Sequence, residues 1–495
     1  MATYDCDDVP SDEVPGDDVP DECPVDLPQA NLEEVASEQD VERLLNLYTL
    51  ILRQMQPTGT DIIRGIPAFR VVQKGPRRWM KGELQKLYSF SEVTSELDEF
   101  WSHSWRTKVW VKYASILLLA NGLPAFLVGT LAALVAGGLS AARYVWCTPA
   151  GTLAYYLTLL LWRRKKKVFL DIACINQEDG GLKAEGLISM GAFLKRSKSF
   201  LVLWDSTYVS RLWCMFEMAA FLRSHELDKG AEESLVVCPV FVGPALLIGH
   251  LGLCTLFMLY LFSPVPQIPW GVLFICGLAF PCLTLFTFAM IAHCRSIDII
   301  QKQVQNFSID NSWSQCCACG HVVPDSGEQM ICDRTIILRC IAAWFGSTEG
   351  FESTVRGKVQ TVLVHQLTHR VFSYWRIVQV TSPALWAFLD FWNTQGHGFL
   401  EYALSAANLC FLFLPCIYLL LLTMAYRVRN LCGWTCTQML LAAGLVAVGV
   451  TSFVLFVMAG DCRNVASGKE GFFSGQRQEG HGDDYRVPFL HSLLL

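Results

Sequence analysis

The sequence has little charge and lacks the common signatures of soluble enzymes. Only 17% of its 495 residues are charged, whereas soluble globular chains have about 25%. It contains no G-x-G-x-x-G segment, no Gly-Lys-Ser/Thr phosphate loop and no H-E-x-x-H motif. A Rossmann fingerprint, P-loop hydrolysis and zincin chemistry are therefore not indicated. With 52% hydrophobic residues and a mean hydropathy of +0.34, the composition is that of a membrane protein.

Basic residues are missing from the start of the chain. Residues 1–40 carry 14 acidic side chains and no basic one, with Pro10, Pro15 and Pro20 in an imperfect five-residue repeat. Such a segment cannot bury enough apolar surface to fold, so we expect a disordered tail that either acts as a solubilising spacer or docks a basic partner. It has no basic n-region and no apolar stretch, so we expect no cleavable signal peptide. The remaining 39 basic and 31 acidic residues give positions 41–495 a net charge of +8.

Long uncharged runs predict membrane helices. A bilayer core needs about 20 apolar helical residues, and residues 113–162 hold two such runs, which predict a transmembrane hairpin. The cluster RRKKK at 163–167 follows at once. Because basic clusters stay on the cytosolic side, both ends of this hairpin and the N-terminus should be cytosolic.

Further apolar runs lie in the second half of the chain. Residues 244–292 predict a second hairpin, and the C-terminal membrane region 377–460 contains candidates at 402–426 and 437–460. A segment at 377–395 carries Asp390 and would either cross the membrane or lie in the interface. The sequence therefore predicts an α-helical multipass membrane protein with six or seven membrane spans. The alternative for any single apolar run is a buried core helix.

Removing the first hairpin leaves an alternation of strands and helices. Residues 95–112 and 163–243 contain apolar strand-like runs at 97–101, 168–170, 200–204 and 235–243, separated by helical patterns over 187–194 and 211–224. Ser206 or Ser210 is the expected cap of the second helix. This alternation predicts a parallel, doubly wound α/β domain, in which ligands bind beyond the carboxyl ends of the strands. The polar segments SHSWR, DIACINQED and WDSTY all begin at those ends.

These segments resemble a known family. SHSW, FLDIACINQ, LVLWDSTYVSRLWCMFE and CPVF together resemble a Toll/interleukin receptor (TIR) domain, and FLDIACINQED is also similar to the signature of heterokaryon-incompatibility (HET) domains. The resemblance implies a cytosolic α/β TIR-like parallel-sheet domain. The chain departs from the family because the first transmembrane hairpin stands where a helix links the first two strands.

The resemblance also implies a site. Many TIR domains hydrolyse NAD with a glutamate in a W-C-x-x-E pattern, which falls on Glu217 here, and a carboxylate beside the ribose would stabilise an oxocarbenium-like transition state. The alternative is that Glu217 is a solvated or salt-bridged helix residue. The loop from Asn176 to Gly181 would be the family's flexible loop. Supporting residues would be His103, Ser104, Asp171, Asn176, Trp213 and Cys214.

A second cytosolic region, 293–376, is rich in cysteine. The pair Cys316-x-x-Cys319, with His321 and Cys332, has ligand types that bind zinc. The alternative is a set of reduced structural thiols. Residues 331–355 should form a helix, a Gly-Ser turn and a further helix. Outside these regions we expect a helical or irregular cytosolic segment at 41–94 and a polar tail at 461–495.

Three functions compete. The first is a membrane-anchored TIR-like signalling protein that self-associates as a scaffold, with NAD as a substrate if Glu217 is catalytic. The second is a channel or transporter with a regulatory α/β domain, and the third is a lipid enzyme, for which no motif argues. The partners implied are the lipid bilayer and other copies of the chain. Basic residues gather beside the apolar runs, which fits anionic lipid better than nucleic acid.

Overall fold

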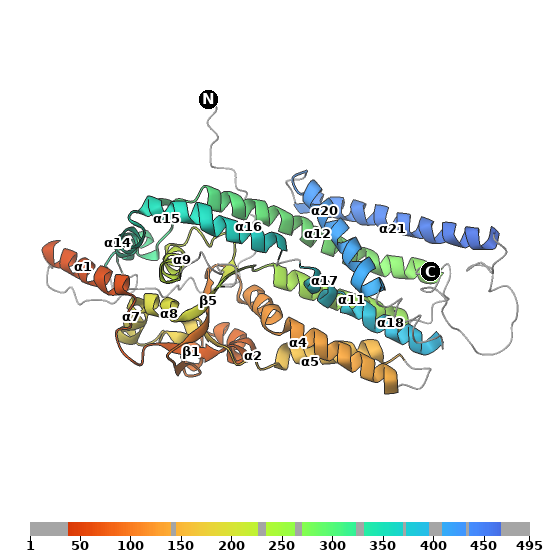
Figure 1. The fold of residues 1–495 in the computed structure, drawn as a ribbon, viewed down its shortest axis with the longest axis horizontal. Coiled ribbons are helices and arrows are strands. Elements are labelled where there is room, and N and C mark those ends of the chain that lie inside the picture. Colours follow the sequence, from red (N-terminus) through yellow and green to blue (C-terminus); the bar gives the residue numbers. More distant parts are fainter. Residues whose placement is uncertain are drawn as a thin grey trace, which may run out of the picture.

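The computed structural model divides into an α/β part and a set of helices that extends from one side of it (Figure 1). It describes residues 38–139, 145–225, 234–262, 270–322, 331–369, 373–395, 408–431 and 435–466. The predicted acidic tail lies outside the described residues except for its last three positions, which begin helix α1 (Glu38–Gln54). Most of the predicted polar tail at 461–495 also lies outside them.

Six strands form one sheet in the order β2-β1-β4-β3-β5-β6. They are β1 (Arg64–Pro67), β2 (Glu92–Val93), β3 (Leu97–His103), β4 (Lys167–Phe169), β5 (Ser197–Trp204) and β6 (Leu235–Pro239). Strands β4, β3, β5 and β6 are parallel, as the sequence predicted, while β1 pairs antiparallel with β4 and with β2. The antiparallel edge was not predicted.

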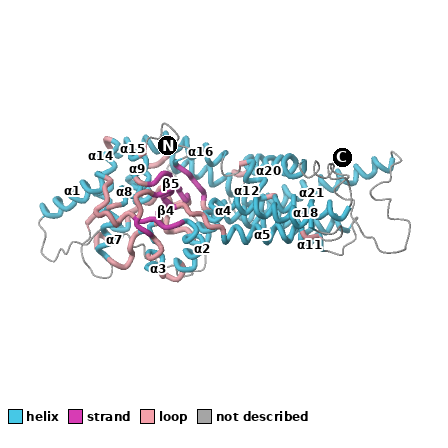
Figure 2. Tube along the Cα trace, turned by 60° about the horizontal axis from the view of Figure 1, so that its bottom comes forward, coloured by secondary structure: helices cyan, strands magenta, loops and turns pink. Residues whose placement is uncertain are grey.

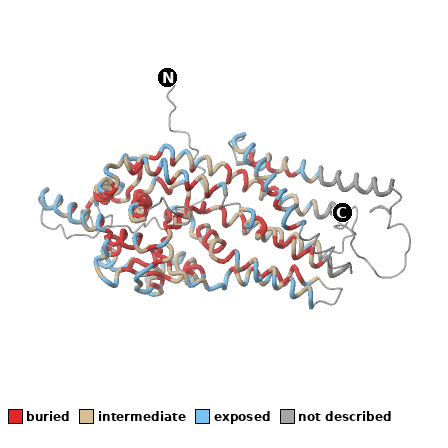
Figure 3. Tube along the Cα trace, in the orientation of Figure 1, coloured by how far each residue is buried: buried red, intermediate tan, exposed pale blue. Residues whose placement is uncertain are grey.

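The parallel strands are buried by helices, so their side chains make a continuous apolar core. Phe100, Phe169 and Phe200 are fully buried, and the rings of Phe100 and Phe169 stack at 4.4 Å. Buried residues gather in the part that contains the sheet (Figure 3), and β4 and β5 lie among helices (Figure 2). These helices are α2 (Ala68–Trp79), α3 (Leu84–Tyr88), α6 (Asp171–Cys174), α7 (Gly180–Ile188), α8 (Met190–Lys195) and α9 (Leu212–Ser224).

Three local predictions were wrong. The single helix expected over 187–194 is divided between α7 and α8 at Ser189, whose hydroxyl accepts the amide of Thr58 at 3.1 Å. Neither Ser206 nor Ser210 caps α9, because its N-cap is Arg211 and has no side-chain cap hydrogen bond. The expected loop through Gly181 ends earlier, since α7 begins at Gly180.

The predicted first hairpin is present as two helices, α4 (Val109–Leu139) and α5 (Cys147–Leu161). Residues 104–108 join β3 to α4, and residues 162–166 join α5 to β4. Strands β3 and β4 nevertheless pair directly, with Phe100 opposite Phe169. The sheet is therefore assembled from pieces on both sides of the inserted hairpin.

Within the described ranges, four helices are long and apolar enough to cross a membrane: Val109–Leu139, Val242–Phe262, Cys276–Gln305 and Cys410–Val428. Shorter apolar helices span Cys147–Leu161 and Cys436–Thr451. The elements that contain these segments, beyond α4 and α5, are α11 (Val242–Phe262), α12 (Trp270–Gln305), η3 (Asn408–Phe413), α20 (Leu414–Val428) and α21 (Thr435–Ala466).

The seventh candidate, 377–395, is not one continuous helix. It is divided at Thr381 between α17 (Tyr374–Val380) and α18 (Ser382–Gln395). Asp390 is fully buried, and its two oxygens accept the amides of Cys147 and Thr148 at 2.7 and 2.8 Å. The carboxylate thus satisfies the free amides at the start of α5.

Small residues let the apolar helices approach each other closely. A Cβ atom on Gly151 of α5 would lie 2.7 Å from the Trp386 ring of α18. A Cβ atom on Gly243 of α11 would lie 2.3 Å from the Cα of Ser115 on α4. Small residues at helix crossings are the usual packing solution in apolar bundles.

The cysteine-containing region packs beside the sheet. It contains η1 (Ile309–Asn311), α13 (Gln315–Ala318), α14 (Asp333–Phe345), α15 (Thr348–Thr354), η2 (Val355–Val359) and α16 (Gln360–His369). The helix–turn–helix predicted for 331–355 is confirmed: Gly346 has φ +83° after α14, and the Ser347 hydroxyl caps α15. The amide of Gln366 pairs with both Leu235 and Val237 and so covers the free edge of β6.

Candidate functional site

A pocket lies at the carboxyl ends of the parallel strands, where the sequence places its polar segments. Its cavity volume is about 50 Å³, which is room for only a few water molecules. Four tryptophans, two basic residues and two carboxylates are among the residues that line it: Trp101, Trp105, Trp213, Trp313, Lys183, Arg211, Asp171 and Glu217.

Glu217 projects from α9 toward the end of β3. The Ser102 hydroxyl donates to its carboxylate at 2.5 Å, and the Tyr208 hydroxyl lies 2.7 Å from the Ser102 oxygen. Because Ser102 has a single proton to give, Tyr208 is the donor in the second bond when Glu217 is ionised. Burial raises the pKa of Glu217 to about 8, the Ser102 bond opposes this shift, and the nearby Asp171 adds to it.

His103 and Asp171 form the neighbouring wall. His103 Nε2 lies 4.0 Å from an Asp171 oxygen and makes no hydrogen bond within the described part of the chain. Burial, reinforced by the positive charge of Lys112, holds the pKa of His103 well below its usual value. Burial raises the pKa of Asp171 to about 6. At neutral pH the imidazole is therefore uncharged, and the contact is weaker than its geometry suggests.

Of the remaining predicted residues, two line the pocket and two lie in the loops at the strand ends. Trp213 lines the pocket and donates to Asp333 at 3.0 Å, while Cys214 lines it and contacts the backbone oxygen of His103 at 3.7 Å. Ser104 bonds to Thr207 at 2.7 Å. Asn176 accepts two amides of its own turn at 3.0 Å. The last two residues shape the strand-end loops and do not line the pocket.

Several residues of the site were not predicted from the sequence: Trp313 lines the pocket, while Ser102 and Tyr208 do not line it but form the hydrogen-bonded chain to Glu217. Ser102 and Tyr208 sit inside the very segments that carry the resemblance, and a hydroxyl within a buried strand was the available signal for Ser102. Trp313 comes from the cysteine-containing region, where no local pattern ties it to the sheet. Its backbone bonds to Ser210 and Leu212 at 2.6 and 3.0 Å, which closes the pocket from that side.

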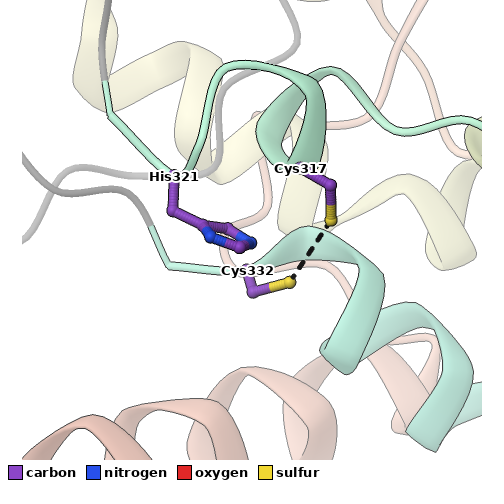
Figure 4. A group of neighbouring side chains, drawn as sticks. All are labelled: Cys317, His321 and Cys332. Atoms are coloured by element: carbon purple, nitrogen blue, oxygen red, sulfur yellow. Dashed lines mark hydrogen bonds between the residues drawn. The ribbon is translucent and has the colours of Figure 1, made fainter.

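The cysteine region supplies a second group. The ligand atoms of Cys317, His321 and Cys332 all lie within 4.8 Å of one another, as Figure 4 shows. This group contains Cys317 in place of the predicted Cys316 and Cys319. The Cys316 thiol donates to the backbone oxygen of Ile331 at 3.5 Å, and the Cys319 sulfur accepts from Gln315 at 3.2 Å.

Comparison with known proteins leaves this site unassigned. No family model, no curated protein and no solved structure matches the chain. The resemblance to TIR and HET domains therefore stays a prediction from the sequence, and the chemistry of the site must be inferred from its geometry.

Proposed function

We propose that this chain is a membrane-anchored TIR-like signalling protein that self-associates and whose Glu217 pocket hydrolyses NAD. The sheet supports the TIR-like part of the proposal. Counted along the chain, its four parallel strands lie in the order second, first, third, fourth, which is a doubly wound arrangement with a ligand crevice beyond the strand ends. Self-association rests on the family resemblance alone.

The observation that carries the NAD hypothesis is that Glu217 lines one pocket together with aromatic and basic side chains. Aromatic faces such as that of Trp105 can stack on a nicotinamide or adenine ring, and Lys183 and Arg211 have the charge to pair with a diphosphate. Glu217 lines the same pocket, so its carboxylate would be close to the ribose that joins the nicotinamide to the diphosphate.

The reaction needs little else from the protein. The bond between the ribose carbon and the nicotinamide nitrogen breaks, and its electron pair leaves with the ring, which becomes neutral nicotinamide. Water adds to the ribose carbon and loses a proton to solvent, which gives ADP-ribose. An ionised Glu217 would stabilise the positive charge that develops on the ribose in between.

The pocket is small in this structure, and this fits a regulated enzyme. A cavity of about 50 Å³ is too small for a nicotinamide riboside, since a drug-sized pocket has roughly 300 Å³ or more. The wall formed by Trp313 and Gln315 would have to move before NAD could enter. We therefore expect low activity in isolated protein and higher activity once copies are brought together.

The channel alternative is less well supported. Two buried ionisable groups of the apolar helices are engaged in packing: Asp390 caps α5, and His250 contacts Tyr156 at 3.1 Å and Ser382 at 3.3 Å. Such groups mark a pathway when they line a water-filled space. The multipass anchor, with the N-terminus and RRKKK in the cytosol, is the simpler use of these helices.

NAD turnover by the full-length protein in lipid nanodiscs tests the proposal, at low density and when clustered on beads. Wild type should release nicotinamide, and Glu217→Gln should lose at least a hundredfold. Glu185→Gln is the matched control, because Glu185 is exposed on α7 and does not line the pocket. Equal turnover in wild type and Glu217→Gln, or none in clustered wild type, would refute the catalytic part.

A further inference from the structure

The three residues Cys317, His321 and Cys332 lie at metal-binding distances. The sulfur atoms of the two cysteines are 3.8 Å apart (Figure 4). Two zinc–sulfur bonds of about 2.3 Å at a tetrahedral angle place their sulfurs about 3.8 Å apart, whereas a disulfide requires about 2.05 Å. The geometry thus fits two thiolates around one ion without movement of the chain.

The backbone is shaped to bring the histidine back to the cysteines. Helix α13 ends at Ala318 and is followed, after Cys319, by two left-handed residues, Gly320 with φ +64° and His321 with φ +61°. The amide of His321 then bonds to the oxygen of Cys316 at 2.9 Å. A left-handed conformation costs a non-glycine residue about 1 kcal/mol, and coordination by the imidazole would offset that cost.

The position of Cys332 favours the thiolate form of its side chain. Cys332 is the N-cap of α14, where the free amides and the helix dipole stabilise negative charge. Thiolate and imidazole together are the ligand set of zinc, rather than of calcium or magnesium, which prefer oxygen.

We propose that Cys317, His321 and Cys332 bind one zinc ion, with water at the fourth position, and that this ion fixes the wall that closes the Glu217 pocket. The site itself does not depend on the proposed function. Its link to the pocket is short: Ser314, in the same segment, donates to Asp333 at 2.5 Å, and Asp333 accepts from Trp213 of α9 at 3.0 Å.

Metal content tests the site without reference to NAD. Full-length protein purified with reducing agent should contain about one zinc per chain by plasma mass spectrometry. Cobalt exchange should give the charge-transfer absorption of thiolate ligands. Cys317→Ser and Cys332→Ser should each lower zinc content at least tenfold, whereas Cys319→Ser should retain it.

Three results would overturn the metal site. The first two are less than a tenth of an equivalent of zinc in reduced wild-type protein and an equal loss of zinc in Cys319→Ser. A Cys317–Cys332 disulfide as the resting state would do the same. To separate loss of metal from misfolding, wild type is stripped with a chelator and zinc is added back. Binding to the folded state should raise the melting temperature, and Cys317→Ser should show no such rise.

Hydrogen exchange tests the second half of the proposal. Removal of zinc should speed amide exchange at least tenfold over residues 309–322 and leave β5 unchanged. Unchanged exchange over 309–322 in metal-free protein would show that the ion does not hold the wall. These readouts stay informative if the protein proves to have no NAD hydrolase activity.

Discussion

Removal of the Ser102 hydroxyl should shift the pH dependence of the Glu217 site. In the folded protein the Ser102 proton is given to the Glu217 carboxylate at 2.5 Å, so the bond favours the ionised form and opposes burial. Ser102→Ala leaves the carboxylate buried without this donor. The pKa of Glu217, already raised to about 8, should therefore rise further.

The size of the shift follows from the strength of the bond. A hydrogen bond to a charged group contributes about 1.5–3 kcal/mol, and one pKa unit corresponds to about 1.4 kcal/mol, so the shift should be about one to two units. With a pKa near 8, about one tenth of wild-type sites are ionised at pH 7. In Ser102→Ala the ionised fraction at that pH should fall at least tenfold.

The assay is kcat/KM for NAD between pH 6 and 10 with clustered protein. In the proposed reaction the ionised Glu217 carboxylate is the active form. The wild-type kcat/KM should therefore rise with pH and level off above about pH 8. The rate of Ser102→Ala should rise in the same way but at higher pH. Tyr208→Phe should shift the midpoint of the wild-type curve by less. A Ser102→Ala loss that is equal at every pH, or a shift to lower pH, would refute the reasoning.

A stability measurement gives the same test without catalysis. Between the unfolded pKa of 4.5 and the folded value near 8, the folded protein binds more protons at Glu217 than the unfolded chain, so stability falls as pH rises through this window. The shift sets a ceiling of about 5 kcal/mol, reduced because the side chain is partly exposed. Glu217→Gln should lack this fall, and parallel melting curves for the two proteins would contradict the assigned pKa.

Three further predictions concern the helices and their orientation. Gly243→Ala should destabilise the protein by more than about 2 kcal/mol in thermal melts, since its Cβ would meet the Ser115 backbone, whereas Gly277→Ala, with nothing within 4 Å, should melt like wild type. Asp390→Leu should lower the free energy of unfolding by about 1–2 kcal/mol through loss of the α5 cap. An unchanged melting temperature would contradict the capping role of Asp390. Asn306, in an Asn-Phe-Ser acceptor, should carry no glycan in a eukaryotic host, while an acceptor introduced within 263–269 should be modified; a glycan on Asn306 would reverse the orientation.

Local sequence was sufficient for the parallel strands and insufficient for the sheet edge. Runs such as FLVLW at 200–204 are continuous and apolar, which is the pattern of a strand buried on both faces. Strand β1 is only RGIP, and β2 has two exposed residues. Neither is long or regular enough to be told from a loop by its sequence. Strand β1 forms because β4 offers an edge to pair with, and β2 forms because β1 in turn offers an edge.

The candidate site shows the same division. His103 and Asp171 follow from the rule that the polar ends of parallel strands meet at one edge, whereas Glu217 follows from the family resemblance. Trp313 and Asp333 follow from neither, because they come from about a hundred residues further along the chain. Trp313 lines the pocket and is held by backbone bonds, and Asp333 accepts a hydrogen bond from the pocket residue Trp213. The cysteine group was found by residue type, but its membership depended on the left-handed turn at His321, which spacing does not reveal.

The inserted hairpin places the pocket beside the point where the chain enters the apolar helices. Residues 104–108 lead directly from the pocket strand into α4. They are also tied to the loop after β5, since Thr107 donates to Asp205 and Ser104 bonds to Thr207. That loop continues into Arg211 at the pocket rim. The segment that leads into α4 and the loop that leads to Arg211 are therefore held together by side-chain hydrogen bonds. The hairpin thus connects the apolar helices to the candidate site through residues 104–108 and 162–166, whereas an anchor attached at one end of the domain would have a single connection.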